Sequence, residues 1–310
     1  MLRDMYADGT KIEACLKEYD LPESMLDLIV VIYGLARHDF DGDAYNLVVN
    51  ALRNKCDYSL MTSNTACMYG ALLIVLYEDP LNKISHMIEL VNVFRGTGFR
   101  SRVSNLMALG LLDESMEPED RSTETLKLYH EIHRKHGFIT GEDDYLAVMH
   151  LAGMKRPIET QIQAVESYYH QLAALSFNKG NALQALSHQL ALFASEDQTA
   201  LVHELDKWCR RFKKDRIKIN GSQILLFGLL GALGLDEEVF MSGLLQRMEK
   251  ARSYNPDSRV HALQRSAIIL EEIHHCIEVE EGVLNPVMKA YIKASMFQLL
   301  SSYLFRERLL

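Results

Sequence analysis

Apolar residues recur along the chain in helix-length blocks, not in the alternating pattern of strands. Five blocks are apolar on almost every side, which predicts helices buried on several faces: MLDLIVVIYGLA, ACMYGALLIVL, NLMALGLL, DYLAVMHLAG and ILLFGLLGALGL. Between them lie segments with a single apolar stripe, such as ETLKLYHEIHRKH and IETQIQAVESYYHQL. A single stripe is typical of a helix packed on one side. The chain is therefore predicted to be all-α, with buried first helices alternating with second helices of an outer layer.

These helical pairs recur at a nearly constant interval. One apolar residue precedes each buried helix, at four intervals of 39 residues and a last one of 40: Leu21, Leu60, Phe99, Phe138, Phe177 and Ile217. The second helices are predicted to begin 37 to 40 residues apart, near Asp43, Leu81, Arg121, Ile158, Gln198 and Glu237. Recurrence of a helical pair at a fixed spacing indicates a repeat architecture. Residues 21–254 are therefore predicted to form six hairpins.

After Asn255-Pro256 the interval breaks, and two longer helices are predicted. Residues 255–310 are interpreted as an atypical C-terminal cap, because the last repeat of a solenoid must cover an otherwise open core. No linker rich in Gly, Ser or Pro divides the chain. Residues 1–310 are therefore predicted to be a single helical repeat domain.

Two architectures fit this repeat. The first is a helical-hairpin repeat superhelix with a period near 39 residues. The alternative is an α/α toroid, in which the first helices form an inner barrel. Glycines inside or late in the first helices cost about 1 kcal/mol each, which predicts close approach to a neighbouring helix at Gly34, Gly70, Gly110, Gly153 and Gly228.

Composition limits the compartment and the partner. The 310 residues carry a net charge of −9, so neither nucleic acid nor an anionic membrane is an expected partner. Five cysteines without a CxxC pair indicate a reducing compartment. The first residues lack the apolar core of a signal peptide, and the longest apolar runs are too short to span a bilayer. A cytoplasmic location is predicted.

Polar residues recur near the starts of the first helices: Asn64, Asn105, Asp144, Gln184 and Gln223. Helix starts carry unpaired N–H groups and a partial positive charge, so a row of them would suit a peptide or a polar small molecule. Helix capping is the more ordinary use of such residues. The candidates for ligand binding are Asn105, Asp144, Gln184, His188 and Gln223, and all but Asn105 are expected to converge in a toroid.

Three groups resemble metal sites but fit simpler roles. His130, His133 and His136 lack the i, i+4 spacing of the HExxH zinc site, so a solvated helix face is preferred. Consecutive residues of EEIHHC (271–276) diverge around a helix, although Glu271 and His275 can pair. The DFDGD segment (39–43) lacks the Gly and Glu that an EF-hand requires, and a turn with an N-cap suffices. No metal or cofactor is expected.

One cluster is basic, with Trp208 and Phe212 interleaved: Lys207, Arg210, Arg211, Lys213, Lys214, Arg216 and Lys218. Such a patch can bind nucleic acid. However, a helix C-terminus favours cations, and Asp206 and Asp215 dilute the cluster. A solvated helix end is therefore preferred. Asp143 and Asp144 diverge by about 100° on a helix, which disfavours a catalytic pair. Repeat toroids assemble sites from scattered residues, so enzymatic activity stays open.

The stretches Gly98–Leu112 and Ile132–Ala152 carry a resemblance to an uncharacterised bacterial family of all-helical proteins, known as a domain of unknown function in Gram-positive species. The resemblance implies the fold and brings no catalytic residue.

Three hypotheses for function follow. The leading one is a non-enzymatic helical-repeat protein that binds a peptide or protein partner in a concave groove. The alternative is an α/α toroid with a central pocket, acting as an enzyme or a small-molecule binder. The third is self-association through an apolar stripe near the C-terminus: Val287, Tyr291, Met296, Leu300 and Leu304.

Overall fold

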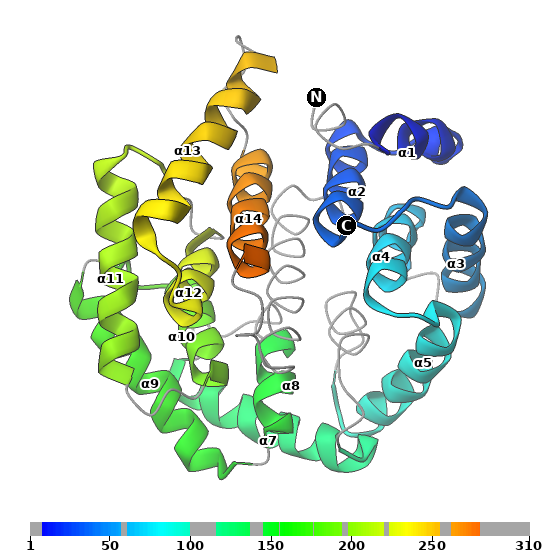
Figure 1. Cartoon of the computed structure of the whole chain (residues 1–310). Helices are drawn as coiled ribbons and strands as arrows, with labels where there is room; N and C mark the ends of the chain where they lie inside the picture. The colour runs from blue at the N-terminus through cyan, green and yellow to red at the C-terminus, as the bar shows by residue number, and fades with distance from the viewer. Residues whose placement is uncertain are drawn as a thin grey trace. The chain divides into compact units, whose positions relative to one another are not determined.

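The computed structural model describes residues 8–56, 61–99, 116–136, 145–154, 156–175, 177–193, 198–219, 223–254 and 262–279. Within these ranges the chain forms helices and no strand, which confirms the predicted all-α class (Figure 1). Contacts divide the chain into two compact units. Unit 1 comprises residues 1–88 and 236–310, and unit 2 comprises residues 89–235.

Unit 1 is built from helices near both ends of the sequence: α1 (Gly9–Leu16), the 3₁₀ helix η2 (Lys17–Tyr19), α2 (Glu23–Ala36), α3 (Gly42–Lys55), α4 (Ser63–Leu76), the first half of α5 (Pro80–Gly96), α13 (Glu237–Tyr254) and α14 (Ala262–Val279). Helix α2 packs against both α4 and α14, while α3 packs on α4 and α13 packs on α14. The contact between α2 and α14 joins segments far apart in the sequence. It is not expected in a solenoid whose repeats contact only their neighbours.

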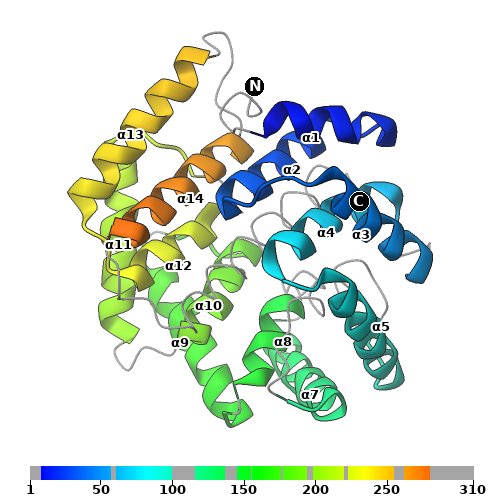
Figure 2. The ribbon, with the colours of Figure 1, turned by 45° about the vertical axis from the view of Figure 1, so that its right-hand side comes forward.

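Unit 2 contains the second half of α5 and six further described helices: α7 (Pro118–His136), α8 (Tyr145–Gly153), α9 (Ile158–Leu175), α10 (Asn181–Phe193), α11 (Gln198–Lys214) and α12 (Ile224–Leu233). Contacts arrange these helices in two rows. In the first row, α10 lies between α8 and α12 (Figures 1 and 2). In the second row, α7 packs on α8, α9 packs on α10 and α11 packs on α12. The first and second helices thus form separate layers within this unit.

Burial follows the predicted difference between the two kinds of helix. Every residue from Thr65 to Leu73 of α4 is buried, as is every residue from Leu225 to Leu230 of α12. The second helices bury a stripe, which in α9 is Gln161, Ile162, Val165, Tyr168, Tyr169 and Leu172. A helix covered on all sides needs an apolar surface all round, whereas a helix in the outer layer keeps its polar face in water.

The second helices begin close to the predicted positions, at Gly42, Pro80, Pro118, Ile158, Gln198 and Glu237. The predicted apolar residues that precede the first helices are buried wherever they are described: Leu21, Phe99, Phe177 and Ile217. Leu60 and Phe138 lie outside the described residues. The boundaries agree with stacked hairpins, while the superhelix and the toroid both stay predictions.

The DFDGD segment forms the predicted turn and N-cap. Asp41 Oδ1 accepts hydrogen bonds from Asp43 N at 2.9 Å and Ala44 N at 3.1 Å, so Asp41 is the cap and α3 begins at Gly42. These bonds satisfy two of the N–H groups that a helix start leaves unpaired. No helix in the described ranges is long and apolar enough to cross a membrane.

Candidate functional site

The candidate residues fall into two groups. Asn105 and Asp144 lie outside the described residues, as does the C-terminal stripe Val287, Tyr291, Met296, Leu300 and Leu304. Gln184, His188 and Gln223 are described, and all three belong to unit 2. Gln184 and His188 lie on α10, and Gln223 directly precedes α12, which packs against α10.

Helix α10 buries an unusual number of hydrogen-bonding side chains. Gln184, Ser187 and His188 are each 0 % exposed, and Gln189 is 1 % exposed. Of these, Ser187 uses its own helix, since its Oγ donates to Leu183 O at 2.8 Å. Buried polar groups are costly unless they are hydrogen-bonded, so four of them on one helix of thirteen residues are a marked departure from an ordinary core.

The four side chains occupy two sides of α10. A Cβ added at Gly228 of α12 would lie 2.5 Å from Gln189 Oε1 and 3.1 Å from Leu186 Cδ1, so this side of α10 faces α12. Successive residues turn by about 100° around a helix. Gln184, Ser187 and His188 therefore share the side of α10 that points away from α12.

Capping does not account for the polar residues at these helix starts. Gln223 is 1 % exposed and occupies the N-cap position of α12 without a side-chain capping bond. Gln184 is the fourth residue of α10 and lies inside the helix. In α4 the cap is Thr62, whose Oγ1 accepts from Thr65 N at 3.2 Å, while Asn64 lies within the helix. We name Gln184, Ser187, His188, Gln189 and Gln223 the polar row.

A buried arginine that the sequence did not indicate lies elsewhere in unit 2. Arg121 of α7 is 2 % exposed, and its Nη1 donates to Met149 O of α8 at 3.0 Å. Its guanidinium occupies the space that a side chain at Gly153 would fill. Arg121 therefore joins α7 to α8 inside the core, and the late Gly153 in the helical pattern makes room for it.

Two of the α7 histidines, His130 and His133, are exposed, in agreement with the predicted solvated face. Their rings contact Tyr129 at centroid distances of 6.0 and 5.8 Å. Across the part of the chain that the structure describes, no group of three His, Cys, Asp or Glu residues is placed to hold a metal ion.

The basic cluster lies at the end of α11, as predicted, but its aromatic residues are in the core. Trp208 and Phe212 are each 1 % exposed, and Phe212 contacts Phe227 of α12 edge-on at 5.2 Å. They are therefore not available to stack on nucleic-acid bases. Two arginines form ion pairs along the helix, Arg210 with Asp206 at 2.5 Å and Arg211 with Asp215 at 2.7 Å.

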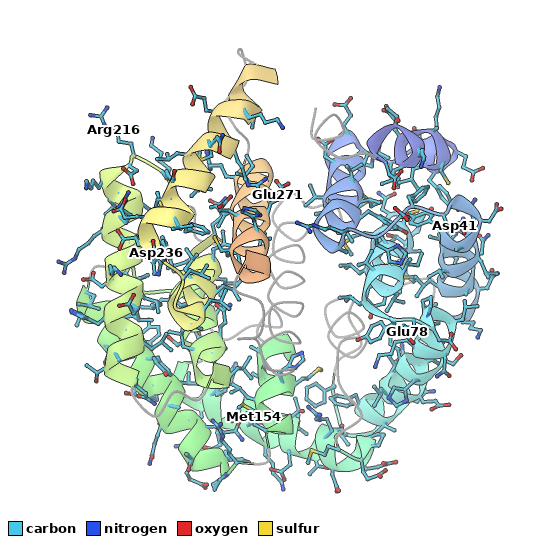
Figure 3. The ribbon with its side chains drawn as sticks, viewed as in Figure 1. Asp41, Glu78, Met154, Arg216, Asp236 and Glu271 are labelled. Atoms are coloured by element: carbon cyan, nitrogen blue, oxygen red, sulfur yellow. The ribbon has the colours of Figure 1, made fainter. Side chains whose placement is uncertain are left out.

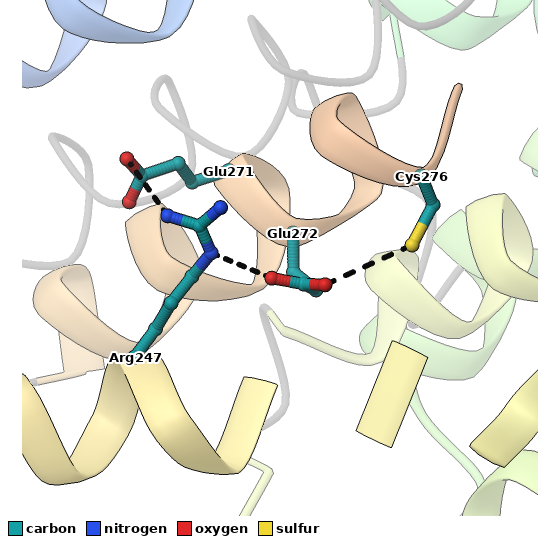
Figure 4. Close-up of polar contacts among 4 residues, drawn as sticks. All are labelled: Arg247, Glu271, Glu272 and Cys276. Carbon is teal, nitrogen blue, oxygen red and sulfur yellow. Dashed lines mark hydrogen bonds and ion pairs between the residues drawn. The ribbon is translucent and has the colours of Figure 1, made fainter. Parts of the chain in front are cut away.

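In unit 1, an ion-pair network joins α13 to α14 (Figure 4). Arg247 Nε lies 2.6 Å from Glu272 Oε2, and Arg247 Nη1 lies 3.4 Å from Glu271 Oε1. The Cys276 thiol donates to Glu272 Oε1 at 3.8 Å. Glu272 is only 2 % exposed, so its carboxylate depends on these partners. Glu271, considered from the sequence as a partner of His275, contacts Arg247 from the neighbouring helix.

The five cysteines are free thiols that differ in burial. Cys67 and Cys276 are buried, whereas Cys15, Cys56 and Cys209 are half-buried. Burial raises the pKa of Cys56 and Cys67 to about 11 and that of Cys209 to about 12. Since the thiolate is the reactive form, these three residues are poor nucleophiles near neutral pH.

Comparison with known proteins places this fold in a family. Residues 16–270 match the family described as protein of unknown function (DUF4003). The chain is also similar to the Uncharacterized protein YeaA of Bacillus subtilis (strain 168), with 24 % identity over 186 residues. That match covers 58 % of this chain and 56 % of the relative, so it spans little more than half of the relative's length. No solved structure matches. The resemblance to an uncharacterised family with Gram-positive members is confirmed, and the chain belongs to the DUF4003 family.

Proposed function

We propose that this protein binds an uncharged polar small molecule through the buried polar side chains of α10. The observation that carries the proposal is the burial of Gln184, Ser187 and His188, each 0 % exposed, on the side of α10 that points away from α12. A peptide lying in an open groove contacts exposed side chains, and these three are covered. An enclosed small ligand therefore fits them better than the groove expected from the sequence, and it corresponds to the alternative with a pocket lined by first helices.

The chemistry of the row suggests the class of ligand. Glutamine amides and serine hydroxyls both donate and accept hydrogen bonds, imidazole nitrogens add further hydrogen-bonding positions, and the row contains no Asp, Glu, Lys or Arg. Ligand sites combine mostly apolar walls with a few well-placed polar groups, and the polar side chains of α10 alternate with the buried leucines Leu183, Leu186 and Leu190. An uncharged molecule with several donors and acceptors, such as one bearing amide or hydroxyl groups, is complementary to this set.

Binding suits the row better than acid–base catalysis. Proton transfer needs titratable groups, usually with different environments that separate their roles. Of the five residues in the polar row, only His188 has a side chain that commonly serves as a general acid or base. Glutamine and serine can orient a substrate, but they do not supply a second acid or base.

Native mass spectrometry tests the proposal on the chain purified without denaturation. The expected spectrum contains a population with the added mass of a small molecule. The double variant Gln184→Met/His188→Leu should lose that population, and circular dichroism of the same sample checks that the variant is folded. Gln161→Met is the matched control, since Gln161 is a buried glutamine on the outer helix α9. Retention of the added mass by the double variant would contradict the proposal.

A second measurement covers a ligand that is lost during purification. Small molecules extracted from cells should raise the melting temperature of the wild type and of Gln161→Met, but not that of Gln184→Met/His188→Leu. If neither experiment distinguishes the double variant from the control, the polar row has a structural role only.

A further inference from the structure

We infer that the exposed basic end of α11 is a docking surface for an acidic segment of a partner protein. The surface comprises Lys213, Lys214, Arg216 and Lys218, all of them exposed. It belongs to unit 2 and is distinct from the buried polar row, so the inference does not depend on the proposed small-molecule site.

The local charge contrasts with the rest of the chain. Residues 207–218 contain seven Lys or Arg and one Asp, a net charge of +6, while the whole chain carries −9, which leaves −15 elsewhere. Three of the seven cations have carboxylate partners on α11 or directly after it. The pairs are Lys207 with Glu204 at 3.6 Å, Arg210 with Asp206, and Arg211 with Asp215. The other four make up the docking surface.

Helix capping explains only part of this surface. Cations in the last turn of a helix are stabilised by its dipole, and this reason applies to Lys213 and Lys214. Arg216 and Lys218 follow the end of α11 at Lys214, where the effect of the dipole falls off. Two of the four cations therefore need another explanation.

Arg216 occupies a position that favours glycine. The end of α11 is a Schellman motif, in which Arg216 N donates to Lys213 O at 3.1 Å and Ile217 N donates to Phe212 O at 2.9 Å. Arg216 has a φ of +58°, a left-handed conformation that strains a residue with a Cβ atom. The buried Ile217 holds the motif in place, and the Arg216 side chain points away from α11 (Figure 3). The Arg216 guanidinium is therefore presented to solvent together with the exposed Lys213, Lys214 and Lys218.

The chemistry favours an acidic protein segment over nucleic acid. Trp208 and Phe212 are buried, so the surface has cations but no exposed aromatic residue of this cluster on which a base can stack. A long polyanion would extend onto a molecule that carries −15 outside residues 207–218 and would be repelled. A short run of carboxylates meets only the basic surface, and the planar Arg216 guanidinium matches a carboxylate with two parallel hydrogen bonds.

Fluorescence anisotropy with a short labelled oligoglutamate peptide tests the inference on the full chain. The wild type should bind the peptide, with an affinity that falls as salt increases. The variant Lys213→Gln/Lys214→Gln/Arg216→Gln should bind at least about tenfold more weakly, because it removes three exposed charge pairs. Arg37→Gly is the matched control, since Arg37 also has a positive φ, +48°, after the end of α2. It should bind as the wild type does.

Further arms of the experiment identify the source of the negative charge and separate the two proposals. Oligouridylate of equal charge and vesicles containing phosphatidylserine should bind more weakly than the peptide. Tighter binding of either would overturn the assignment to a protein segment, as would unchanged peptide binding by the triple variant or no salt-dependent binding by the wild type. Gln184→Met/His188→Leu should bind the peptide normally, so failure of the small-molecule proposal leaves this result unaffected.

Discussion

Replacing Gly243 with alanine is expected to destabilise the protein, although alanine is the better helix former. Gly243 lies inside α13, where alanine is favoured by about 1 kcal/mol. A Cβ atom there would lie 2.0 Å from Glu272 Oε1 and 2.5 Å from Glu272 Cδ. The buried carboxylate would have to move, and the 2.6 Å contact between Glu272 and Arg247 would be lost.

The expected magnitude follows from these two opposing effects. Removing one partner of a buried ion pair costs about 3–5 kcal/mol. Here Glu272 is displaced, not removed, and the Arg247 side chain is 31 % exposed, so solvent screening reduces the cost to about 2–3 kcal/mol. Subtracting the gain in helix propensity leaves a net destabilisation of about 1–2 kcal/mol for Gly243→Ala.

A double-mutant cycle tests the physical cause. In a Glu272→Ala background the added Cβ meets no carboxylate, so Gly243→Ala should stabilise the protein by about 1 kcal/mol. The sign of the effect therefore reverses between the two backgrounds. Urea unfolding followed by circular dichroism measures it, as a change in midpoint at constant slope.

The control is Gly96→Ala at the end of α5, where nothing lies within 4 Å of the added Cβ. This substitution should not destabilise the protein. If Gly243→Ala stabilised the wild type, or had the same effect in both backgrounds, the contact between Gly243 and Glu272 would have no energetic role and the reasoning would be refuted.

Three further substitutions test other parts of the structure. Arg216→Gly should raise the free energy of unfolding by up to about 1 kcal/mol, since it relieves the left-handed conformation, and urea unfolding should detect no loss of stability. Asp41→Ala should lower the free energy of unfolding by about 1 kcal/mol through loss of the α3 cap, measured by thermal denaturation against the exposed control Asp39→Ala. Burial raises the pKa of Cys67 from 9.0 to about 11. The buried, protonated thiol therefore stabilises the fold below pH 9, and this contribution is lost as the pH rises towards 11. The urea midpoint should fall over this interval, and the fall should be smaller in Cys67→Ala.

The helices and their layers were predictable because both depend on local patterns. A block such as ILLFGLLGALGL has no polar face to present to water, and α12 is accordingly buried from Leu225 to Leu230. Turn residues and caps fixed the starts of the second helices to within a few residues, as Asp41 does for α3. The two compact units were not predicted, because contacts between distant segments, such as α2 with α14, leave no local pattern in the sequence.

Buried polar side chains were harder to predict. Charged residues are rarely buried without a partner, so sequence reasoning assigns them to the surface by default. Arg121 and Glu272 are each 2 % exposed because another helix supplies the partner, Met149 O in one case and Arg247 in the other. Trp208 and Phe212 show the converse case, since they alternate with basic residues in the sequence while their aromatic rings are buried.

Glycines inside the helices show where the buried polar side chains find space. Close approach to a neighbouring helix was predicted for Gly70, Gly153 and Gly228, and it is confirmed where a Cβ would meet Val49, Arg121 and Gln189. At Gly70 the neighbour is an aliphatic side chain, as in ordinary helix packing. At Gly153, Gly228 and Gly243 the nearest atom belongs to a buried polar head group, at 1.9, 2.5 and 2.0 Å from the added Cβ.

A polar head group needs both space and partners inside a helical core, and a glycine on the facing helix provides the space. The head groups of Arg121, Gln189 and Glu272 each lie against such a glycine, and the three side chains are 1–2 % exposed. The helix propensity lost at each glycine, about 1 kcal/mol, is small beside the 3–5 kcal/mol that an unpaired buried charge costs. The glycines of this chain thus serve two uses, since Gly153, Gly228 and Gly243 make room for polar head groups, whereas Gly70 and Gly231 face the aliphatic side chains of Val49 and Leu205. Alanine at Gly153 should displace the Arg121 guanidinium from Met149 O and loosen α8. Hydrogen exchange of the α8 amides should therefore become faster than in the wild type, and unchanged or slower exchange would contradict this reasoning.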